Sequence, residues 1–233
     1  MNKSLRNKIH GKARQYAVLF LEELSSSDFI GPTIESIATI KEIVLIYDRI
    51  DDPEAEGFSA KGRGSKFIFI NSNFNERLQK FTIAHEIYHL DEIVEEFEDS
   101  EEDERAADHF AANILLPEKI VLEKHHVLQN LGYDDVKIFF SLADLSGAPY
   151  ETLYKRYQEI KIDTSKIDHA LKKVSLNEES LYLKEAELKF QKLRKDSALA
   201  SIELDEPNHK TTFGELETLI SYFNQTKMEA DNE

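Results

Sequence analysis

The sequence predicts an α+β protein in which several amphipathic helices accompany a small sheet. Apolar residues recur at helical spacing over most of the chain, which indicates helices that bury one face. Two short runs, EIVLIYD (42–48) and SKFIFIN (65–71), are instead rich in β-branched and aromatic residues and are typical of strands. The turn formers Asp51-Asp52-Pro53 lie between them, so we expect these two strands to share a small antiparallel sheet.

The helices are expected to follow one another along the rest of the chain. They are predicted over residues 5–24 and 33–41, from about 75 into the 90s, from about 101 or 103 to 116, and on to about 132. Residues 138–160 have the rhythm of a helix, a Ser-Gly-Ala-Pro turn and a second helix, and two more helices are expected around 183–193 and 213–223. We therefore divide the chain into a domain over 1–135, a helix-turn-helix-like segment over 136–162 and a helical C-terminal region over 163–233.

Composition and charge exclude several classes of site and partner. The chain has 233 residues, 41% of them hydrophobic, no cysteine and a net charge of −16. Thiolate metal sites and disulfides are excluded, and an acidic chain without a basic block is repelled by nucleic acid phosphates. No signal peptide and no apolar run of membrane-spanning length is visible. We expect a cytoplasmic protein that contacts neither membrane nor nucleic acid directly.

The run FTIAHEIYHL (81–90) carries the chemistry. His85 and His89 are four residues apart, so on a helix they lie about 40° apart on one face. The helix is apolar over most of its remaining surface and is predicted to be buried and central. Two imidazoles on a rigid helix can bind one ion, and a catalytic zinc uses three protein ligands and water. Glu86 lies beside that face, where it can act as the general base. Zinc is preferred for these ligands, with manganese and iron as alternatives.

A third ligand is expected on the next helix, ERAADHFAANILLP (104–117). Glu104 and Asp108 are one turn apart on a face continued by small alanines, which would let this helix approach the histidine helix closely. We predict Glu104 as the third metal ligand, and Asp108 as the acceptor for the free ring N–H of a ligand histidine. The neighbouring acids Glu101, Glu102 and Asp103 are competing candidates for the third ligand.

These motifs resemble the ImmA/IrrE-type metallopeptidases over roughly residues 10–160. The resemblance rests on FTIAHEIYHL, the downstream ERAADHFAANILLP, the FIFIN strand and a Pro-preceded helix before EIVLIYD. It implies a zincin-like α+β peptidase domain, with His85, His89 and Glu104 as zinc ligands and Glu86 as catalytic base. It also implies that the protein cleaves a helix-turn-helix transcriptional repressor. Loss of that repressor would then release a stress response or a mobile element. Tyr88, where the family usually has glycine, and Asp108, where asparagine is common, depart from the pattern. The first is expected to alter the cleft wall.

Several features stay open between two interpretations. The acidic run 91–104 is either a solvated loop or a docking surface for a basic repressor. The 65–71 strand either packs in the core or offers an edge to an extended substrate peptide. The helix-turn-helix-like segment packs on the peptidase domain or holds the substrate. The residue that stabilises the oxyanion is unknown, and its candidates are Tyr88, His109, His125 and His126.

Two functions follow from this sequence. The first is a zinc-dependent endopeptidase acting on a regulatory protein, a basic helix-turn-helix repressor. The second is a non-catalytic antirepressor or antitoxin-like binding module that keeps the peptidase fold. Glu86 distinguishes them, because a module that only binds has no chemical need for an acid at that position.

Overall fold

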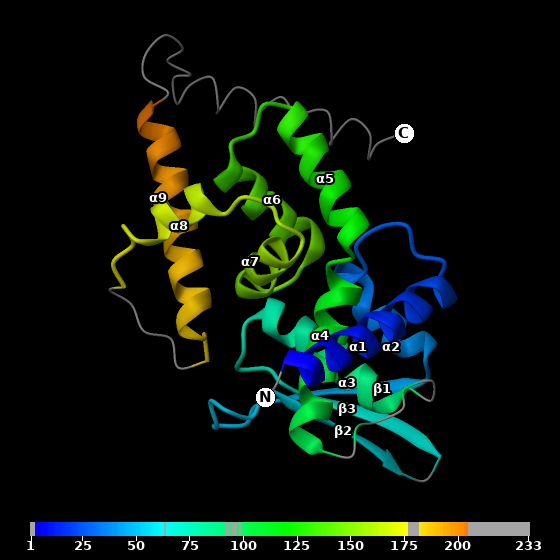
Figure 1. Ribbon diagram of the computed structural model, residues 1–233. Helices are drawn as coiled ribbons and strands as arrows, with labels where there is room; N and C mark the ends of the chain where they lie inside the picture. The colour runs from blue at the N-terminus through cyan, green and yellow to red at the C-terminus, as the bar shows by residue number, and fades with distance from the viewer. Residues whose placement is uncertain are drawn as a thin grey trace, which may run out of the picture. The chain divides into compact units, whose positions relative to one another are not determined.

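A computed structural model of the chain describes residues 3–62, 64–91, 94, 97, 99–176 and 182–204. The chain divides into two units, Met1–Arg194 and Lys195–Glu233, and the fold described here is that of the first (Figure 1). The predicted α+β class is confirmed. In chain order the elements are α1 (Lys3–Glu23), η1 (Gly31–Thr33), α2 (Ile34–Ile40), β1 (Ile43–Asp48), β2 (Gly57–Gly62), β3 (Ser65–Asn71), α3 (Glu76–Leu90), α4 (Ser100–Leu115), α5 (Glu118–Asn130), α6 (Asp135–Ser146), α7 (Tyr150–Glu159), α8 (Ser165–Leu171) and α9 (Glu185–Leu204).

The sheet has three strands in the order β1-β3-β2. The two strands predicted from sequence, β1 and β3, pair in parallel, so the expected antiparallel pairing between them is wrong. The antiparallel partner of β3 is β2, which the sequence analysis did not predict because GFSAKG begins and ends with glycine and has no β-branched residue. Since β2 reverses the chain direction between β1 and β3, the third strand runs parallel to the first.

The central place of β3 changes which edge a peptide could use. Both edges of β3 are hydrogen-bonded, so the expectation that a substrate adds to the Phe67–Asn71 strand is wrong. The free edges belong to β1 and β2. Strand β2 also lies against α3, where a side chain on Gly57 would come within 2.7 Å of Thr82 Cγ2 and 2.4 Å of Phe69 O. Glycine is therefore required at Gly57 for β2 to lie this close to α3.

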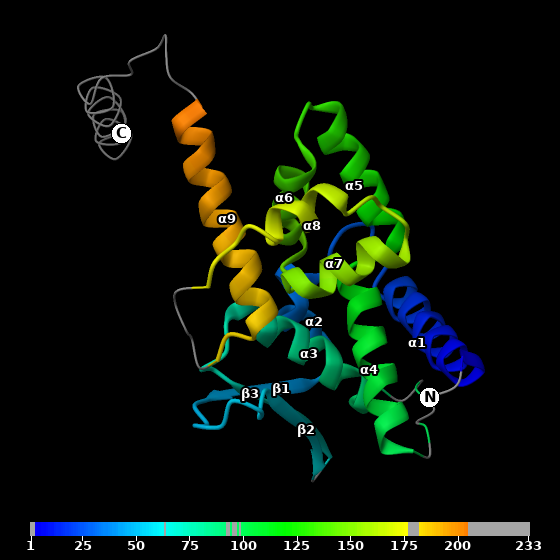
Figure 2. The same cartoon turned by 60° about the vertical axis from the view of Figure 1, so that its left-hand side comes forward.

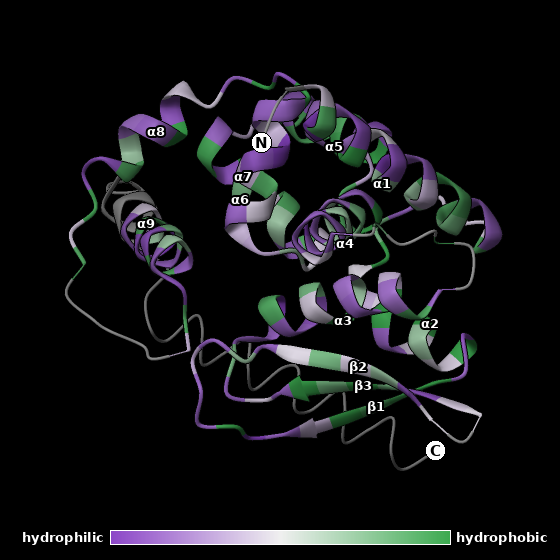
Figure 3. Ribbon diagram, turned by 60° about the horizontal axis from the view of Figure 1, so that its bottom comes forward, coloured by the Kyte–Doolittle hydropathy of each residue, from purple (hydrophilic) through white to green (hydrophobic). Residues whose placement is uncertain are grey.

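Helix α3 is central, as predicted. Its first turn is capped by Asn75, whose side-chain oxygen accepts from the backbone N–H groups of Arg77 and Leu78. It ends at Leu90, because Asp91 has an extended backbone, so the expected continuation into the 90s is absent. Figure 3 shows α2 and α3 between the sheet and the layer that contains α1 and α4. Ala107 and Ala111 of α4 are fully buried, in keeping with the predicted close approach of α4.

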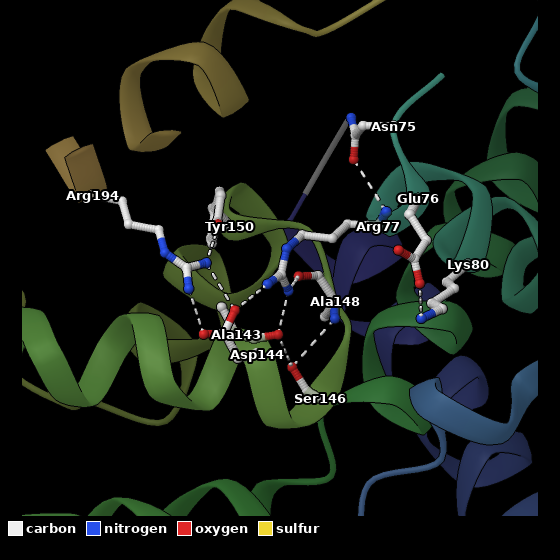
Figure 4. Close-up of polar contacts among 10 residues, drawn as sticks. All are labelled: Asn75, Glu76, Arg77, Lys80, Ala143, Asp144, Ser146, Ala148, Tyr150 and Arg194. Atoms are coloured by element: carbon white, nitrogen blue, oxygen red, sulfur yellow. Dashed lines mark hydrogen bonds and ion pairs between the residues drawn. The ribbon is translucent and has the colours of Figure 1, made fainter. Parts of the chain in front are cut away.

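The helix-turn-helix-like segment consists of α6 and α7 and is tied to α3 (Figure 4). The Arg77 guanidinium of α3 donates to the backbone oxygens of Ala143 and Ala148 and pairs with Asp144. The turn between the helices contains Gly147 at φ +67°, a left-handed conformation that glycine adopts without strain. The predicted domain boundaries at 135 and 162 both fall inside the first unit and remain predictions.

The part of α9 within the first unit packs on this segment. Phe190 and Leu193 are buried, and Arg194 pairs with Asp144 and donates to the Tyr150 hydroxyl (Figure 4). This helix confirms the one expected around 183–193. The helix expected at 213–223 and most of the acidic run between 91 and 99 lie outside the described residues. Among the helices that are described, none has an apolar stretch long enough to cross a bilayer.

Candidate metal centre

Helices α3 and α4 bring together three of the predicted side chains, and both views in Figures 1 and 2 show these helices side by side. His85 and His89 face one another with 3.3 Å between their Nε2 atoms. Glu104 of α4 reaches both rings, with Oε2 at 3.1 Å from His85 Nε2 and Oε1 at 3.6 Å from His89 Nε2. Three possible ligand atoms from two helices therefore converge on one point.

These distances fit a tetrahedral ion. Ligand atoms about 2.0–2.1 Å from zinc at tetrahedral angles are about 3.3 Å from one another. The separations of 3.1, 3.3 and 3.6 Å lie around that value, with His85 and His89 each nearest to a different oxygen of the Glu104 carboxylate. The ring centroids of His85 and His89 are 5.2 Å apart, and two tetrahedrally placed imidazoles have centroids about 5 Å apart. No ion is part of the structure, yet the donor set and its spacing suit zinc.

The other ring nitrogen of each histidine faces a carboxylate. His85 Nδ1 is 2.9 Å from Asp108 Oδ1, and His89 Nδ1 is 3.3 Å from Asp103 Oδ2. An ionised carboxylate can only accept, so a hydrogen on each Nδ1 is held by these contacts, and in that tautomer each Nε2 presents its lone pair to an ion beside Glu104. Asp108 therefore lies where its predicted contact requires. The carboxylates orient both rings toward Glu104.

Asp103 is the residue that the sequence analysis misplaced. It was considered only as a competing ligand, whereas its side chain is buried, accepts from the Tyr88 hydroxyl and the Phe97 backbone N–H, and approaches His89. The available signal was its helical position. Asp103, Ala107 and Phe110 recur at intervals of four and three, which places this acid on the apolar face of α4.

The protonation of His85 is set by opposing influences. Burial lowers the pKa of the imidazole, but the hydrogen bond that His85 donates to Asp108 and the negative charges of Asp108, Glu86 and Glu104 outweigh it and raise the pKa above its usual value. The surrounding charge thus favours a positive species at this point, whether a proton or a metal ion.

Glu86 and Tyr88 are both buried on α3. Glu86 is 8% exposed, which fits a general base shielded from bulk solvent. Tyr88 packs against Phe110, with 5.6 Å between ring centroids, and is fully buried. The expectation that Tyr88 shapes the cleft wall is therefore wrong, and its hydroxyl is engaged with Asp103. Its large side chain is part of the core, where it packs between α3 and the rings of Tyr16 in α1 and Phe110 in α4.

A second group of the same composition lies farther along α4. His10 of α1, His109 of α4 and Glu159 of α7 each have a possible ligand atom within 4.8 Å of the others. However, the His10 and His109 ring centroids are only 3.5 Å apart, with the rings tilted by 46°, so the two rings are too close to bind one tetrahedral ion together as they stand. Burial lowers the pKa of both rings, that of His109 to about 4, and neighbouring positive groups add to this. The pair is neutral at neutral pH.

A cleft of about 350 Å³ adjoins the metal centre. Asp108 and His109 line it from α4, and residues 149, 151, 152, 155, 156 and 159 line it from the start of α7 onward. The second helix of the helix-turn-helix-like segment thus faces this cleft. Of the four oxyanion candidates, only His109 lines it, because Tyr88 is in the core and His125 and His126 lie on α5.

Comparison with known proteins identifies the family. Residues 38–158 match the Peptidase M78 family, described as the IrrE N-terminal-like domain, over slightly more than half of the chain. That range includes α3, α4 and the helix-turn-helix-like segment. No curated protein matches the chain. The converging histidines and glutamate and the matched residues agree, and the chain belongs to the IrrE N-terminal-like family of M78 peptidases.

Proposed function

We propose that this protein is a zinc-dependent endopeptidase that hydrolyses a peptide bond in a regulatory protein. His85, His89 and Glu104 are the zinc ligands, Asp108 and Asp103 orient the histidines, and Glu86 is the catalytic base. The observation that carries the proposal is the convergence of both Nε2 atoms on Glu104 at tetrahedral spacing, with each Nδ1 on a carboxylate.

In the proposed hydrolysis, the metal ion and the side chains of the protein have separate roles. When bound, zinc acts as a Lewis acid that polarises the scissile carbonyl and lowers the pKa of water. Glu86 takes the proton of the attacking water and delivers it to the leaving amine. Its burial and its position directly after His85 in the sequence support this role. His109, which lines the cleft and is neutral, is the candidate that could donate to the developing oxyanion as an N–H.

The substrate is proposed to bind as an added strand. Strand β2 has a free edge, lies against α3 and is largely exposed, so an extended peptide could hydrogen-bond to it and pass the metal centre. This assigns to β2 one of the two roles that the sequence analysis left open for the β3 segment. The zincin-like geometry is retained, because the edge strand, α3 and the cleft adjoin one another.

The proposed partner is a basic helix-turn-helix repressor in the cytoplasm. A net charge of −16 favours association with a basic protein and disfavours direct binding to nucleic acid. The helix-turn-helix-like segment of this chain is not presented as a free reading helix, because Tyr150, Leu153 and Tyr157 of α7 are buried. Residues of α7 that face the cleft are available to a protein substrate instead.

The test is Glu86→Gln in the full chain loaded with zinc. The substitution keeps the size of the side chain and removes the base, so cleavage is expected to fall about 10²–10⁴-fold while zinc content stays at about one per chain. Cleavage is measured by mass spectrometry of new N-termini in a proteome-derived peptide mixture and in purified helix-turn-helix repressors. Glu76→Gln is the matched control, because Glu76 is an exposed residue in the first turn of the same helix.

Equal cleavage by wild type and Glu86→Gln would contradict the enzymatic assignment. The binding-module interpretation would take its place if both forms bound a repressor and neither cut it. Loss of zinc in Glu86→Gln would contradict the separation of roles between ligand and base.

A further inference from the structure

The cleft beside the metal centre is built partly by residues outside the matched family domain. It begins at Asp108, whose carboxylate contacts His85, and passes Phe81 and the α7 residues Glu151 and Arg156. Beyond α7 it reaches Glu187 in α9, well past residue 158, where the family match ends. The far end of the cleft is therefore a feature of this chain and not of the shared domain.

The basic residues that line this cleft are already neutralised by ion pairs. Each has a carboxylate partner: Lys155 with Glu151 at 2.8 Å, Arg156 with Glu159 at 3.0 Å, Arg105 with Glu101 at 2.5 Å, and Lys184 with Glu56. Two lining acids lack a lysine or arginine partner among the described residues, namely Asp108 and Glu187. Asp108 is occupied by His85, which leaves Glu187 as the lining acid without an ion pair among the described residues, with the charge of Arg77 acting on it only from a distance.

Only one of the two carboxylate oxygens of Glu187 has a hydrogen-bond partner among the described residues. Its Oε1 accepts the backbone N–H of Glu151 at 2.9 Å, at the start of α7. Its Oε2 is buried and has no hydrogen-bond partner among the described residues, and the residue as a whole is only 1% exposed. Such a buried acceptor costs about 1–3 kcal/mol, so a donor at this position would be favourable. Burial raises the pKa of this carboxyl group and outweighs the backbone N–H groups of Glu151 and Tyr150 and the charge of Arg77, which lower it.

We propose that this cleft is a specificity subsite for a lysine or arginine side chain of the substrate, with Glu187 Oε2 accepting from its cationic head. This rests on the proposed peptidase function. A long basic side chain fits the volume of about 350 Å³, with its apolar stem beside Leu78 and Phe81. The head group forms a charge-assisted hydrogen bond in a partly desolvated site, where such bonds are strong. Because the cleft starts next to His85, a residue held there lies close to the bond that is cut.

The first test measures binding without catalysis. Nα-acetyl-arginine amide and Nα-acetyl-lysine amide are titrated into the zinc-loaded full chain, followed by amide NMR, with the neutral Nα-acetyl-citrulline amide as a matched probe. We expect the basic probes to bind at least tenfold more weakly to Glu187→Gln and within twofold of wild type to Glu185→Gln. Glu185 is on the same helix but exposed, and it pairs with Lys189 at 2.7 Å.

The wild-type chain gives a readout that does not depend on how the variant folds. The amide of Glu151 donates to Glu187, so its resonance is expected to shift saturably with the arginine probe and not with the citrulline probe. No shift, or equal binding of both probes, would mean that an ordered water satisfies Oε2 and would overturn the subsite. Unchanged affinity in Glu187→Gln would also overturn it.

Cleavage mapping separates the subsite from the activity. Wild type is expected to cut the peptide mixture with lysine or arginine enriched at one position relative to the bond, and Glu187→Gln is expected to lose that enrichment. Glu86-dependent cleavage without basic preference would overturn the subsite and leave the proposed function intact. Saturable probe binding without any Glu86-dependent cleavage would overturn the proposed function alone.

Discussion

The His85–His89–Glu104 group and the His10–His109–Glu159 group have the same composition, and both use a residue of α4. In the first, the ring centroids are 5.2 Å apart and each Nδ1 has a carboxylate, so the lone pairs of both Nε2 atoms point to one place. In the second, the centroids are 3.5 Å apart and the rings lie against one another. Residue type alone does not make a metal site, because ring separation and the contact of the distal nitrogen decide where each lone pair points.

The electrostatic surroundings of the two groups also favour a metal ion at the first group and not at the second. Acids surround His85 and raise its pKa, whereas burial and nearby positive groups lower the pKa of His10 and His109. Arg6 lies beside His10, with 3.5 Å between Arg6 Nε and His10 Nε2, and Arg156 already holds Glu159. A divalent cation is therefore favoured at the first group and opposed at the second.

The largest expected effect is on metal content. His85→Ala with His89→Ala should reduce bound zinc from about one per chain to nearly none, because two of three ligands are removed. The matched variant, His10→Ala with His109→Ala, should retain about one zinc per chain. Elemental mass spectrometry of dialysed, untagged protein checks both. If the second variant loses the metal and the first keeps it, the assignment of the two groups is reversed.

A smaller effect is expected from the carboxylate that orients His85. Asp108→Asn should weaken zinc binding about 10–100-fold, which is typical when a partner of a ligand histidine is changed. Competition against a chelator of known affinity measures this. Glu159→Gln, which removes the acid of the second group, should leave zinc affinity unchanged, and an equal loss in both variants would show that the effect is only general electrostatics. Asp108 is preferred to Asp103 for this test because Asp103 also accepts two hydrogen bonds in the core.

The smallest expected effect is on the pH dependence of stability. His109 has a pKa of about 4 in the folded chain against 6.5 in the unfolded chain, so the unfolded state binds more protons between these values. The contribution of His109 to the free energy of unfolding is thus complete above pH 6.5 and is lost as the pH falls toward 4. Urea denaturation of wild type and His109→Gln at several pH values checks this, and the variant should show a shallower decline.

The exposed His126 provides the control for this experiment. His126→Gln should decline with pH much as wild type does, because His126 is an exposed residue of α5 and is not part of the His10–His109 pair. A decline of the same slope in all three proteins would mean that the His10–His109 pair does not contribute to acid sensitivity.

Much of the architecture follows from local patterns. The apolar spacing of α1 and α3, the β-branched runs of β1 and β3 and the glycine turn before α7 are each determined by a few neighbouring residues. The largely exposed strand β2, with glycine at both ends, had no β-branched run, and it forms because β3 offers an open edge. The parallel pairing of β1 with β3, and with it the edge available to a peptide, could not be inferred while β2 was missed.

The sequence alone determined that two histidines share one face of a buried helix and that acids on the next helix lie one turn apart, because helical periodicity converts spacing into direction. Only the tertiary structure decided which acids reach those histidines, because this depends on how α3 and α4 pack. In the structure Asp103 contacts His89, Tyr88 is buried in the core, and residues of α7 line the cleft. These outcomes depend on contacts between residues far apart in the chain, and local spacing carries no information about such contacts.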